Sequence, residues 1–440
     1  MRRRKFIKNS IGVMATQIAL GGVNFKVKAS EFAWMASKAV ASNNNILVII
    51  QLSGGNDGLN MLPPLDQMSK YLSLRPTIGL AENTILPLGT TGAGLHPVMT
   101  GMKGLYDDGN LLVVQGLSYP NQTFSHFAAT QIWSAGINNT QESTGWMGRF
   151  LAQEYPTYPD DTFQDPIALQ VEDLSTALFS SLNGTMSSSY NYQSLNSIIA
   201  NARLASTDVY TDYLAFIQQQ IQLSDTFSVR IKQAGALGAN ANSNYPNTTL
   251  ANKLKVVAKL INGGLQTKVY HVILGGFDTH NSQLSRQSSL LTELSGALTA
   301  FQKDLLAMGN GIADRVAGMT FSEFGRRALE NTSGGTDHGT SVPMFVFGTK
   351  LGKSKMIGTS PNLNNLTSNN LPMQYDYRQA YSAFLQQWLG LSSSLSDQVL
   401  LQTSSARLAN ARQAETFAPL PLFNTSANCQ TCGTVNIQKN

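Results

Sequence analysis

Short apolar runs that end at glycine or other turn residues are the clearest pattern in this chain of 440 residues. Four to eight apolar residues closed by a turn signal are typical of buried strands in a parallel sheet. The pattern predicts six strands, over residues 46–52, 111–116, 167–171, 269–274, 316–322 and 344–347. Between the strands, leucines recur near a 3.6-residue period over residues 283–308, which predicts an amphipathic helix. Residues 209–234 are predicted to form a second long helix.

This alternation of strands and helices predicts an α/β fold with a mostly parallel central sheet. No linker rich in Pro, Gly or Ser divides the chain, so we expect residues 30–415 to form a single domain. Residues 140–206 are polar and irregular, and residues 239–249 are rich in Asn, so both are expected to be surface insertions. Residues 416–440 are expected to form a polar C-terminal tail.

The N-terminal segment indicates where the protein works. Residues 1–29 carry seven basic residues and no acidic one, and a mildly apolar stretch, residues 11–23, follows the arginines. The segment resembles a twin-arginine export signal with a small residue, Ala29, for cleavage. A basic disordered tail or a nucleic-acid-binding arm is the alternative. We expect export by the twin-arginine machinery to the periplasm or cell surface of a bacterium, and no transmembrane span, because a span needs about 20 apolar residues.

The charge of the chain changes once this leader is set aside. The net charge is +5, and the leader contributes +7 of it, which leaves −2 for the remainder. The remainder shows no basic patch with interleaved aromatic residues. We therefore expect no nucleic-acid partner.

Two cysteines, Cys429 and Cys432, lie in the predicted tail with the spacing Cys-x-x-Cys. Such a pair can be a redox pair, half of a zinc site or a small disulfide loop. No second pair and no downstream histidine completes a zinc site. Because an exported protein meets an oxidising compartment, a local disulfide or a passive pair is favoured.

Carboxylates follow three of the predicted strands. Asp57 follows the first strand, Asp278 and His280 follow the strand at 269–274, and Glu323 follows the strand at 316–322. Asn56-Asp57-Gly58 alone could be only a turn. However, the carboxyl ends of parallel strands meet at one edge of the sheet, where ligands bind. The repeated pattern therefore favours a shared site.

Further candidate residues lie close to the third of these strands. Asp337 and His338 follow it in a glycine-rich loop, and Arg326 follows Glu323. Asp, Glu and His supply the ligands that suit Zn, Mn, Fe or Mg, and two metals about 3.5–4 Å apart can clamp a phosphoryl or sulfuryl group. Arg326 could bind an anionic substrate group, or it could hold a surface carboxylate.

Ser125 is the candidate nucleophile. It follows the strand at 111–116 and precedes a predicted helix, which it would cap. The free N–H groups of a helix N-terminus can hold an oxyanion or a phosphate. A role as nucleophile and a role as cap alone both remain open, and His126 is either a ligand or a polar contact.

Together these motifs resemble the DUF1501 family of exported bacterial proteins. The resemblance covers nearly all of residues 1–390 and rests on the basic leader and on six motifs: Gly54-Gly-Asn-Asp-Gly58, Leu95-His-Pro97, Ser125-His-Phe127, Gly275-Gly-Phe-Asp-Thr-His280, Ser322-Glu-Phe-Gly-Arg326 and Gly335-Thr-Asp-His-Gly339. The family is grouped with the alkaline phosphatase and sulfatase superfamily. The resemblance therefore implies a three-layer α/β sandwich with a core that holds two metals.

The resemblance also implies roles for individual residues. Asp57 would bind one metal, Ser125 would be the nucleophile, and Asp278 and His280 would bind the other metal. Two assignments complete the set: either Asp337-His338 is the next ligand pair and the last histidine is missing, or Glu323 takes the place of that pair and His338 is the last ligand. We prefer the second, because Glu323 lies at a strand end.

Two hypotheses of function follow. The first is an exported, metal-dependent hydrolase acting on a small anionic phosphate or sulfate ester. The second is a catalytically degenerate member of the same fold that binds a ligand or scaffolds an envelope or surface assembly.

Overall fold

The computed structural model describes residues 18–20, 23–25, 44–159, 163–172, 175–182, 184–200, 226–242, 244–401 and 417–424. The chain divides into two compact units, Met1–Asn44 and Asn45–Asn440. In the first unit, β1 (Ile18–Leu20) pairs antiparallel with β2 (Val23–Phe25). The export signal and the domain boundaries at 29 and 415 stay predictions.

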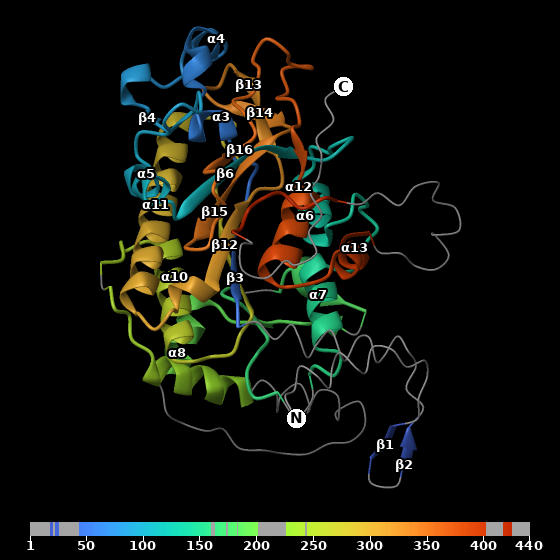
Figure 1. Ribbon diagram of the computed structural model, residues 1–440. Coiled ribbons are helices and arrows are strands. Elements are labelled where there is room, and N and C mark those ends of the chain that lie inside the picture. Colours follow the sequence, from blue (N-terminus) through green and yellow to red (C-terminus); the bar gives the residue numbers. More distant parts are fainter. Residues whose placement is uncertain are drawn as a thin grey trace. The chain divides into compact units, whose positions relative to one another are not determined.

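A nine-stranded sheet forms the centre of the second unit (Figure 1). Its order is β10 (Ser188–Ser189), β7 (Ala168–Gln170), β11 (Val269–Leu274), β3 (Ile46–Leu52), β12 (Val316–Phe321), β15 (Val342–Gly348), β6 (Leu111–Ser118) and β16 (Met356–Ile357), and β17 (Tyr375–Asp376) also pairs with β6. All strands run in one direction except β15, which is antiparallel to both of its neighbours. The six predicted strands are all present, each within two residues of its predicted ends.

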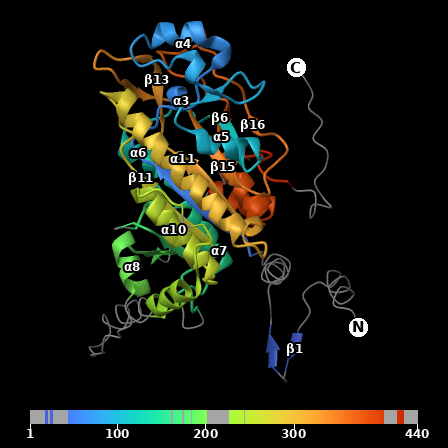
Figure 2. The same cartoon turned by 90° about the vertical axis from the view of Figure 1, so that its left-hand side faces the viewer.

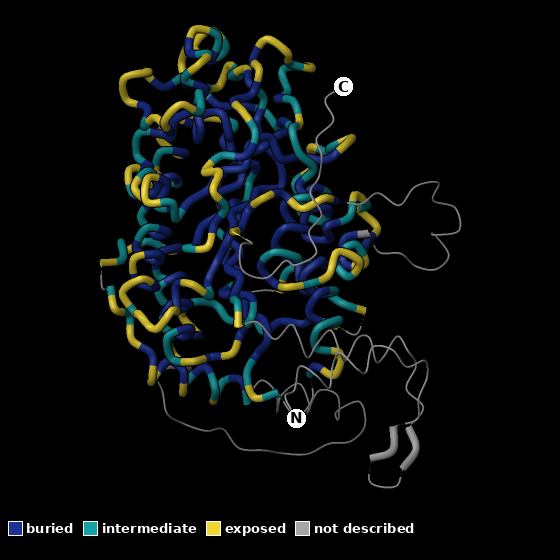
Figure 3. Tube along the Cα trace, in the orientation of Figure 1, coloured by how far each residue is buried: buried dark blue, intermediate teal, exposed yellow. Residues whose placement is uncertain are grey.

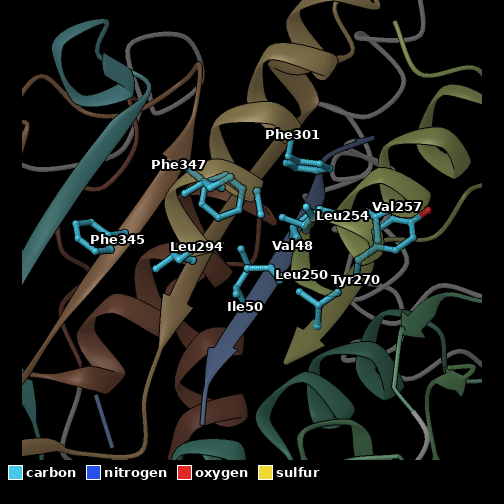
Figure 4. Packing of buried hydrophobic residues seen from close by; sticks show 14 of the residues in the cluster. Val48, Ile50, Leu250, Leu254, Val257, Tyr270, Leu294, Phe301, Phe345 and Phe347 are labelled. Atoms are coloured by element: carbon cyan, nitrogen blue, oxygen red, sulfur yellow. The ribbon is translucent and has the colours of Figure 1, made fainter. Parts of the chain in front are cut away.

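Helices cover both faces of this sheet. Successive residues of a strand point to opposite faces, and Val48 and Ile50 of β3 pack in one core cluster while Leu47 and Ile49 pack in another. The first cluster includes residues of α5 (Thr100–Asp107), α8 (Tyr192–Ala200), α10 (Thr249–Asn262) and α11 (Gln283–Ala307). Figure 2 shows these four helices, and Figure 4 shows residues of α10 and α11 packed against β3. The second lies under α6 (His126–Ala135), α7 (Trp146–Glu154), α12 (Tyr377–Ala383) and α13 (Ser393–Leu401).

All seven residues of β3 are buried, and the dark centre of Figure 3 marks the same region. Burying a Val, Leu or Ile side chain stabilises a fold by roughly 1.5–3 kcal/mol, so this strand anchors both helical layers. The structure thus confirms the predicted α/β class with its mostly parallel sheet, and it has the three layers that were expected.

Smaller elements complete the second unit. The helices are α3 (Gly58–Met61) and α4 (Met68–Leu74), with 3₁₀ turns at 65–67, 82–84, 177–179 and 313–315 and a π-helical turn at 384–388. The hairpins are β4 (Leu86–Pro87) with β5 (Gly94–Leu95), β8 (Ser180–Ser181) with β9 (Gly184–Thr185), and β13 (Gly325–Glu330) with β14 (Thr336–Gly339). Among the described residues, no helix combines the length and the apolar character needed to cross a membrane.

Three regions differ from the expectations or add to them. The segment 140–206, expected as a surface insertion, supplies β7 and β10 to the sheet, and α7 buries Trp146 and Phe150. The Asn-rich segment 239–249 is tied to α11, because Asp304 accepts hydrogen bonds from Asn240 and Asn242. Of the expected helix 209–234, residues 226–234 are helical and the rest lie outside the described residues.

The predicted polar tail is also partly packed against the second unit. Phe423 is buried and stacks on Trp388, with 5.1 Å between the ring centroids. Its buried neighbours in the described part of the tail are Phe417, Leu420 and Leu422. Cys429 and Cys432 lie outside the described residues.

Candidate metal centre

The ends of three neighbouring parallel strands meet at one edge of the sheet, as predicted. The segment after β3 is hydrogen bonded to the segments after β11 and β12 on either side: the Phe277 N–H donates to the Ser53 carbonyl at 3.1 Å, and the Gly54 N–H donates to Glu323 Oε1 at 2.9 Å. The Asn56 N–H donates to Ser322 Oγ at 2.9 Å. The carboxylates that follow these strands are therefore held in one region by backbone contacts.

Two glycines of the sequence motifs allow this close approach. Gly54 has a φ of +122°, and a Cβ atom there would lie 2.4 Å from the backbone nitrogen of Asp278. A Cβ atom at Gly335 would lie 2.3 Å from the carbonyl carbon of His280. Side chains at these positions would push the loops apart, since only glycine tolerates such contacts and such a φ without strain.

Three histidines converge on one carboxylate oxygen. Asp278 Oδ1 lies 3.1 Å from His280 Nε2, 3.4 Å from His338 Nε2 and 3.5 Å from His126 Nε2. The two Nε2 atoms of His280 and His338 are 2.9 Å apart. The chain has only five histidines, so this cluster gathers most of them from three distant segments.

The other nitrogen of each ring faces an acceptor. His338 Nδ1 lies 2.7 Å from the carbonyl oxygen of Phe124, which can only accept a hydrogen bond. His126 Nδ1 lies 2.8 Å from Glu323 Oε1, and His280 Nδ1 lies 3.4 Å from an oxygen of Asp337. With the ring protons on Nδ1, the Nε2 lone pairs face Asp278, which is the pattern of histidines that bind metals.

The donor set fits a divalent cation. Four lone-pair donors around one point repel one another unless a cation or a proton lies between them, and within the described residues His126 Nε2 is buried without a hydrogen-bond partner. Metal–nitrogen bonds of 2.0–2.1 Å in a tetrahedral site place neighbouring ligand atoms about 3.3 Å apart. The separations of 2.9–3.4 Å among Asp278, His280 and His338 are close to this spacing, and the ligand atoms of His126, Asp278 and His338 lie within 4.8 Å of one another.

The electrostatics of the cluster favour the same forms. Burial tends to raise the pKa of Asp278, but the hydrogen bond and charge of Arg326, with His280 and His126, outweigh it and lower the pKa to about 2. Burial lowers the pKa of His338. An ionised carboxylate and a neutral imidazole are the forms that bind a metal.

Arg326 supports Asp278 from behind. Its side chain is fully buried, and Nη2 donates to Asp278 Oδ1 at 2.6 Å while Nε and Nη1 donate to the carbonyls of Gly55 and Thr336. The sequence-based interpretation of Arg326 as a substrate-binding residue does not fit this position, because its N–H groups are engaged inside the fold. Arg326 is instead a positioning residue.

Asp57 lies outside the cluster. It is 1% exposed, and its carboxylate accepts hydrogen bonds from Arg75 Nη1 at 2.5 Å and Nη2 at 2.9 Å. It also accepts from the side chain of Gln283 and caps α3 through the Leu59 N–H. Asp57, expected as a metal ligand, is therefore engaged as one half of a buried ion pair.

The remaining predicted ligands differ in whether they face Asp278 directly. His280 and His338 present nitrogen atoms directly to Asp278, whereas Glu323 and Asp337 lie one step back, beside Nδ1 atoms of the histidines. Phe324, fully buried, packs against the rings of His126 and His338 with centroid distances of 4.8 and 4.6 Å.

Ser125 caps α6, as the sequence predicted. Its Oγ accepts the Ala128 N–H at 3.4 Å, and the residue is exposed. Its neighbours on either side both serve the cluster, since the carbonyl of Phe124 binds His338 and the ring of His126 faces Asp278. From the sequence, His126 was either a ligand or a polar contact. The feature that could have identified it as part of the site is its position directly after the helix cap, Ser125.

Comparisons with known proteins agree with the motifs. A search of the curated proteins found no match. Among solved structures, the chain is similar to the C-terminal periplasmic domain of EcEptC from Escherichia coli in complex with Zn, with 10% identity, a TM-score of 0.33 and coverage of 70% of this chain and 74% of that chain. It is also similar to the PsFucS1 sulfatase from Pseudoalteromonas sp., with 11% identity, a TM-score of 0.30 and coverage of 90% and 75%.

The DUF1501 family, described as a protein of unknown function, matches residues 112–403. The matched range covers well over half of the sequence, from β6 to the end of α13, and it contains all three histidines of the cluster. The chain belongs to the DUF1501 family.

Proposed function

We propose that the protein is an exported, metal-dependent hydrolase of phosphate or sulfate esters. The observation that supports this proposal is the convergence of three Nε2 atoms on Asp278 Oδ1, with the Nδ1 atom of each ring facing an acceptor. Metal-assisted hydrolysis is the reaction class that such a donor set serves when it lies at the carboxyl edge of an α/β sheet.

Four side chains would hold the cation: His126, Asp278, His280 and His338. A divalent cation bound there would stabilise the negative charge that develops on the ester oxygens. Three imidazoles and one carboxylate favour Zn, Mn or Fe over Mg, which prefers oxygen ligands. Glu323 orients the ring of His126 and would thereby set the strength of binding.

In this proposal Ser125 is the nucleophile. Its Oγ lies at the start of α6, where the first N–H groups lack partners within the helix and the dipole favours negative charge. The oxygen forms a bond to phosphorus or sulfur while the ester bond breaks, and the serine proton leaves with the alcohol. Water then cleaves the seryl ester, which releases phosphate or sulfate and restores the hydroxyl.

The leader is part of the same proposal. Residues 1–29 would direct export through the twin-arginine machinery to the periplasm or cell surface. Replacing Arg3 and Arg4 with Lys should keep the precursor in the cytoplasm, as measured by cell fractionation. Unchanged export of that variant would count against the twin-arginine route.

The second candidate function is ligand binding or scaffolding without turnover. The observation that favours it is the ion pair of Asp57 with Arg75, which keeps the carboxylate after β3 out of the cluster. A site that lacks this carboxylate would not assemble the two-metal centre implied by the superfamily.

Metal analysis and turnover together distinguish the two functions. Protein purified after incubation with Zn²⁺ or Mn²⁺ should retain about one equivalent per chain, as expected of a single site, and His338→Ala should retain none. His96→Asn is the matched control: His96 is a buried histidine outside the cluster whose Nδ1 accepts the Val98 N–H, an interaction that Asn can keep. Absence of bound metal in the parent protein would overturn the metal centre.

Turnover is then measured with an aryl phosphate and an aryl sulfate. The parent should cleave one of them, and Ser125→Ala should lose turnover while it keeps the metal. Bound metal without turnover of either ester would favour the binding role, and full turnover in Ser125→Ala would remove Ser125 as the nucleophile.

A further inference from the structure

A cavity of about 630 Å³ opens beside the histidine cluster. Small-molecule sites occupy roughly 300–1,000 Å³, so this space accommodates more than an ester group alone. Its walls come from the end of β3, the start of α6, the end of β11 and the 3₁₀ turn at 177–179. His126 and Asp278 lie on its wall, so the cavity and the candidate metal centre are continuous.

The cavity is lined by amides and hydroxyls, of which those of Gln131 and Thr176 already donate to Glu142 and Gln170. Gln51 and Ser134 are only 5% and 3% exposed, and neither side chain has a hydrogen-bond partner among the described residues. The hydroxyls of Ser53, Thr130 and Thr176 line the same space. Buried polar groups without partners are costly, so amides and hydroxyls of this kind indicate a ligand that supplies hydrogen-bonding groups of its own.

The lining carries no positive charge of its own beyond the cluster. Among the described residues that form the wall, the ionisable ones are His126, Asp278 and Glu323, and none is Lys or Arg. The nearest guanidinium of the site, Arg326, is buried and engaged with carbonyls and Asp278. The part of a ligand that fills the cavity is therefore uncharged, and only the part that reaches the cluster is anionic.

Phe127 adds an aromatic surface to this wall. It is 85% exposed, although it follows His126 directly on the first turn of α6 and lines the cavity. Single exposed apolar side chains are normal on protein surfaces, but Phe127 lies on the wall of a polar cavity, where a bound ring can stack on it. An aromatic face next to amides and hydroxyls matches a sugar ring, which presents C–H groups on its faces and hydroxyls at its edge.

We propose that the cavity binds a neutral sugar residue whose phosphate or sulfate ester reaches the cluster. This inference rests on the proposed hydrolase function for the ester, but the sugar site itself is defined by Gln51, Ser134 and Phe127. The substrate class is then a carbohydrate ester and not a nucleotide.

Sugar binding can be measured without turnover. The full-length protein, stripped of metal, is titrated with glucose, galactose, mannose and their disaccharides by ligand-observed NMR, with uridine as the comparison ligand. At least one neutral sugar should bind in the millimolar range or tighter, and uridine should not. Phe127→Ala and Gln51→Leu should each weaken sugar binding about tenfold, the effect of losing one buried contact of roughly 1.4 kcal/mol.

Leu237→Ala is the matched control, because Leu237 is 79% exposed and lies outside the cavity wall. Its sugar affinity should equal that of the parent, and circular dichroism of all three variants reports whether each has folded. Equal loss of binding in Leu237→Ala, binding of uridine instead of sugars, or no sugar binding at all would overturn the inference.

Measurements of ester cleavage and of sugar binding together test the proposed function and the sugar site independently. If the protein cleaves aryl esters but binds no sugar, the hydrolase stands and the sugar site falls. If it binds sugars in the manner predicted but cleaves no sugar phosphate or sulfate, the sugar site stands and the hydrolase falls.

Discussion

Asp57 and Asp278 follow neighbouring parallel strands, and an arginine binds each of them, yet the two pairs have opposite character. Arg75 holds Asp57 through two nitrogens, and both side chains are fully buried. Arg326 contacts Asp278 through one nitrogen and leaves the aspartate side chain 47% exposed. The first pair is closed, while the second leaves a carboxylate oxygen turned toward three imidazoles. The comparison teaches that the arginine, and not the strand end, decides what such an aspartate can do.

The partners of the two arginines explain this difference. Arg75 also donates to the carbonyls of Ala328 and Arg327 in β13, so the Asp57 pair joins the loop after β3 to that hairpin. Arg326 lies within β13 itself and is paired directly with His338 of β14. Residues opposite each other in an antiparallel pair share a face. The same hairpin therefore closes one ion pair and presents a histidine to the other.

The largest expected effect concerns stability. Asp57→Asn should lower the free energy of unfolding by about 3–5 kcal/mol, because it leaves the guanidinium of Arg75 buried without its counter-charge. Asp278→Asn should cost less, about 1–3 kcal/mol, because the buried Arg326 loses a charged acceptor while that aspartate is itself half exposed. Urea unfolding of the metal-free variants measures both values. Similar losses of unfolding free energy in the two variants would contradict the difference between the Asp57–Arg75 and Asp278–Arg326 pairs.

The next prediction concerns metal binding, for which Asp278→Asn should have the larger effect and Asp57→Asn the smaller one. Asp278→Asn should weaken Zn²⁺ binding by at least about 100-fold, since changes to groups behind the ligands already cost about 10–100-fold. Asp57→Asn, once folded, should bind Zn²⁺ within a few-fold of the parent. Competition with a chelator of known affinity gives both constants. Unchanged affinity in Asp278→Asn would remove it from the proposed ligand set.

The smallest expected effect tests the role of Glu323, which contacts His126. Glu323→Gln should weaken Zn²⁺ binding about tenfold, because the amide still accepts from the Nδ1 of His126 but no longer strengthens it by charge. Glu330→Gln is the control, as Glu330 binds the backbone of Thr77 and Ile78 away from the cluster. A Glu323 variant that matches its control would leave Glu323 with a purely structural role.

Local pattern was enough to predict the sheet and the edge at which the candidate site lies. Apolar runs gave the strands, and the glycines after them marked loops that approach closely, as Gly54 and Gly335 do. The capping role of Ser125 was also readable, because a helix start has its own residue preferences. These features depend on residues near one another in the chain.

The partners of the candidate residues could not be predicted in the same way. Arg75 contacts Asp57 from the end of α4. Arg326 lies opposite His338 in the hairpin of β13 and β14, which the apolar pattern did not reveal. The strand β7 gives another example of partners that could not be predicted. The strand itself was predicted, but Ser187 and Thr176, which satisfy the amide of its buried Gln170, were not.

The sheet that carries these sites ends in very short strands. In the described structure, β10 closes one side with two residues, and β16 and β17, two residues each, cover the outer side of β6. Long unpaired strand edges are templates on which other chains can add strands and aggregate. A second copy of this protein would find only brief stretches of free backbone to pair with. Crowding many copies together should therefore favour contacts through side chains over growth of a shared sheet.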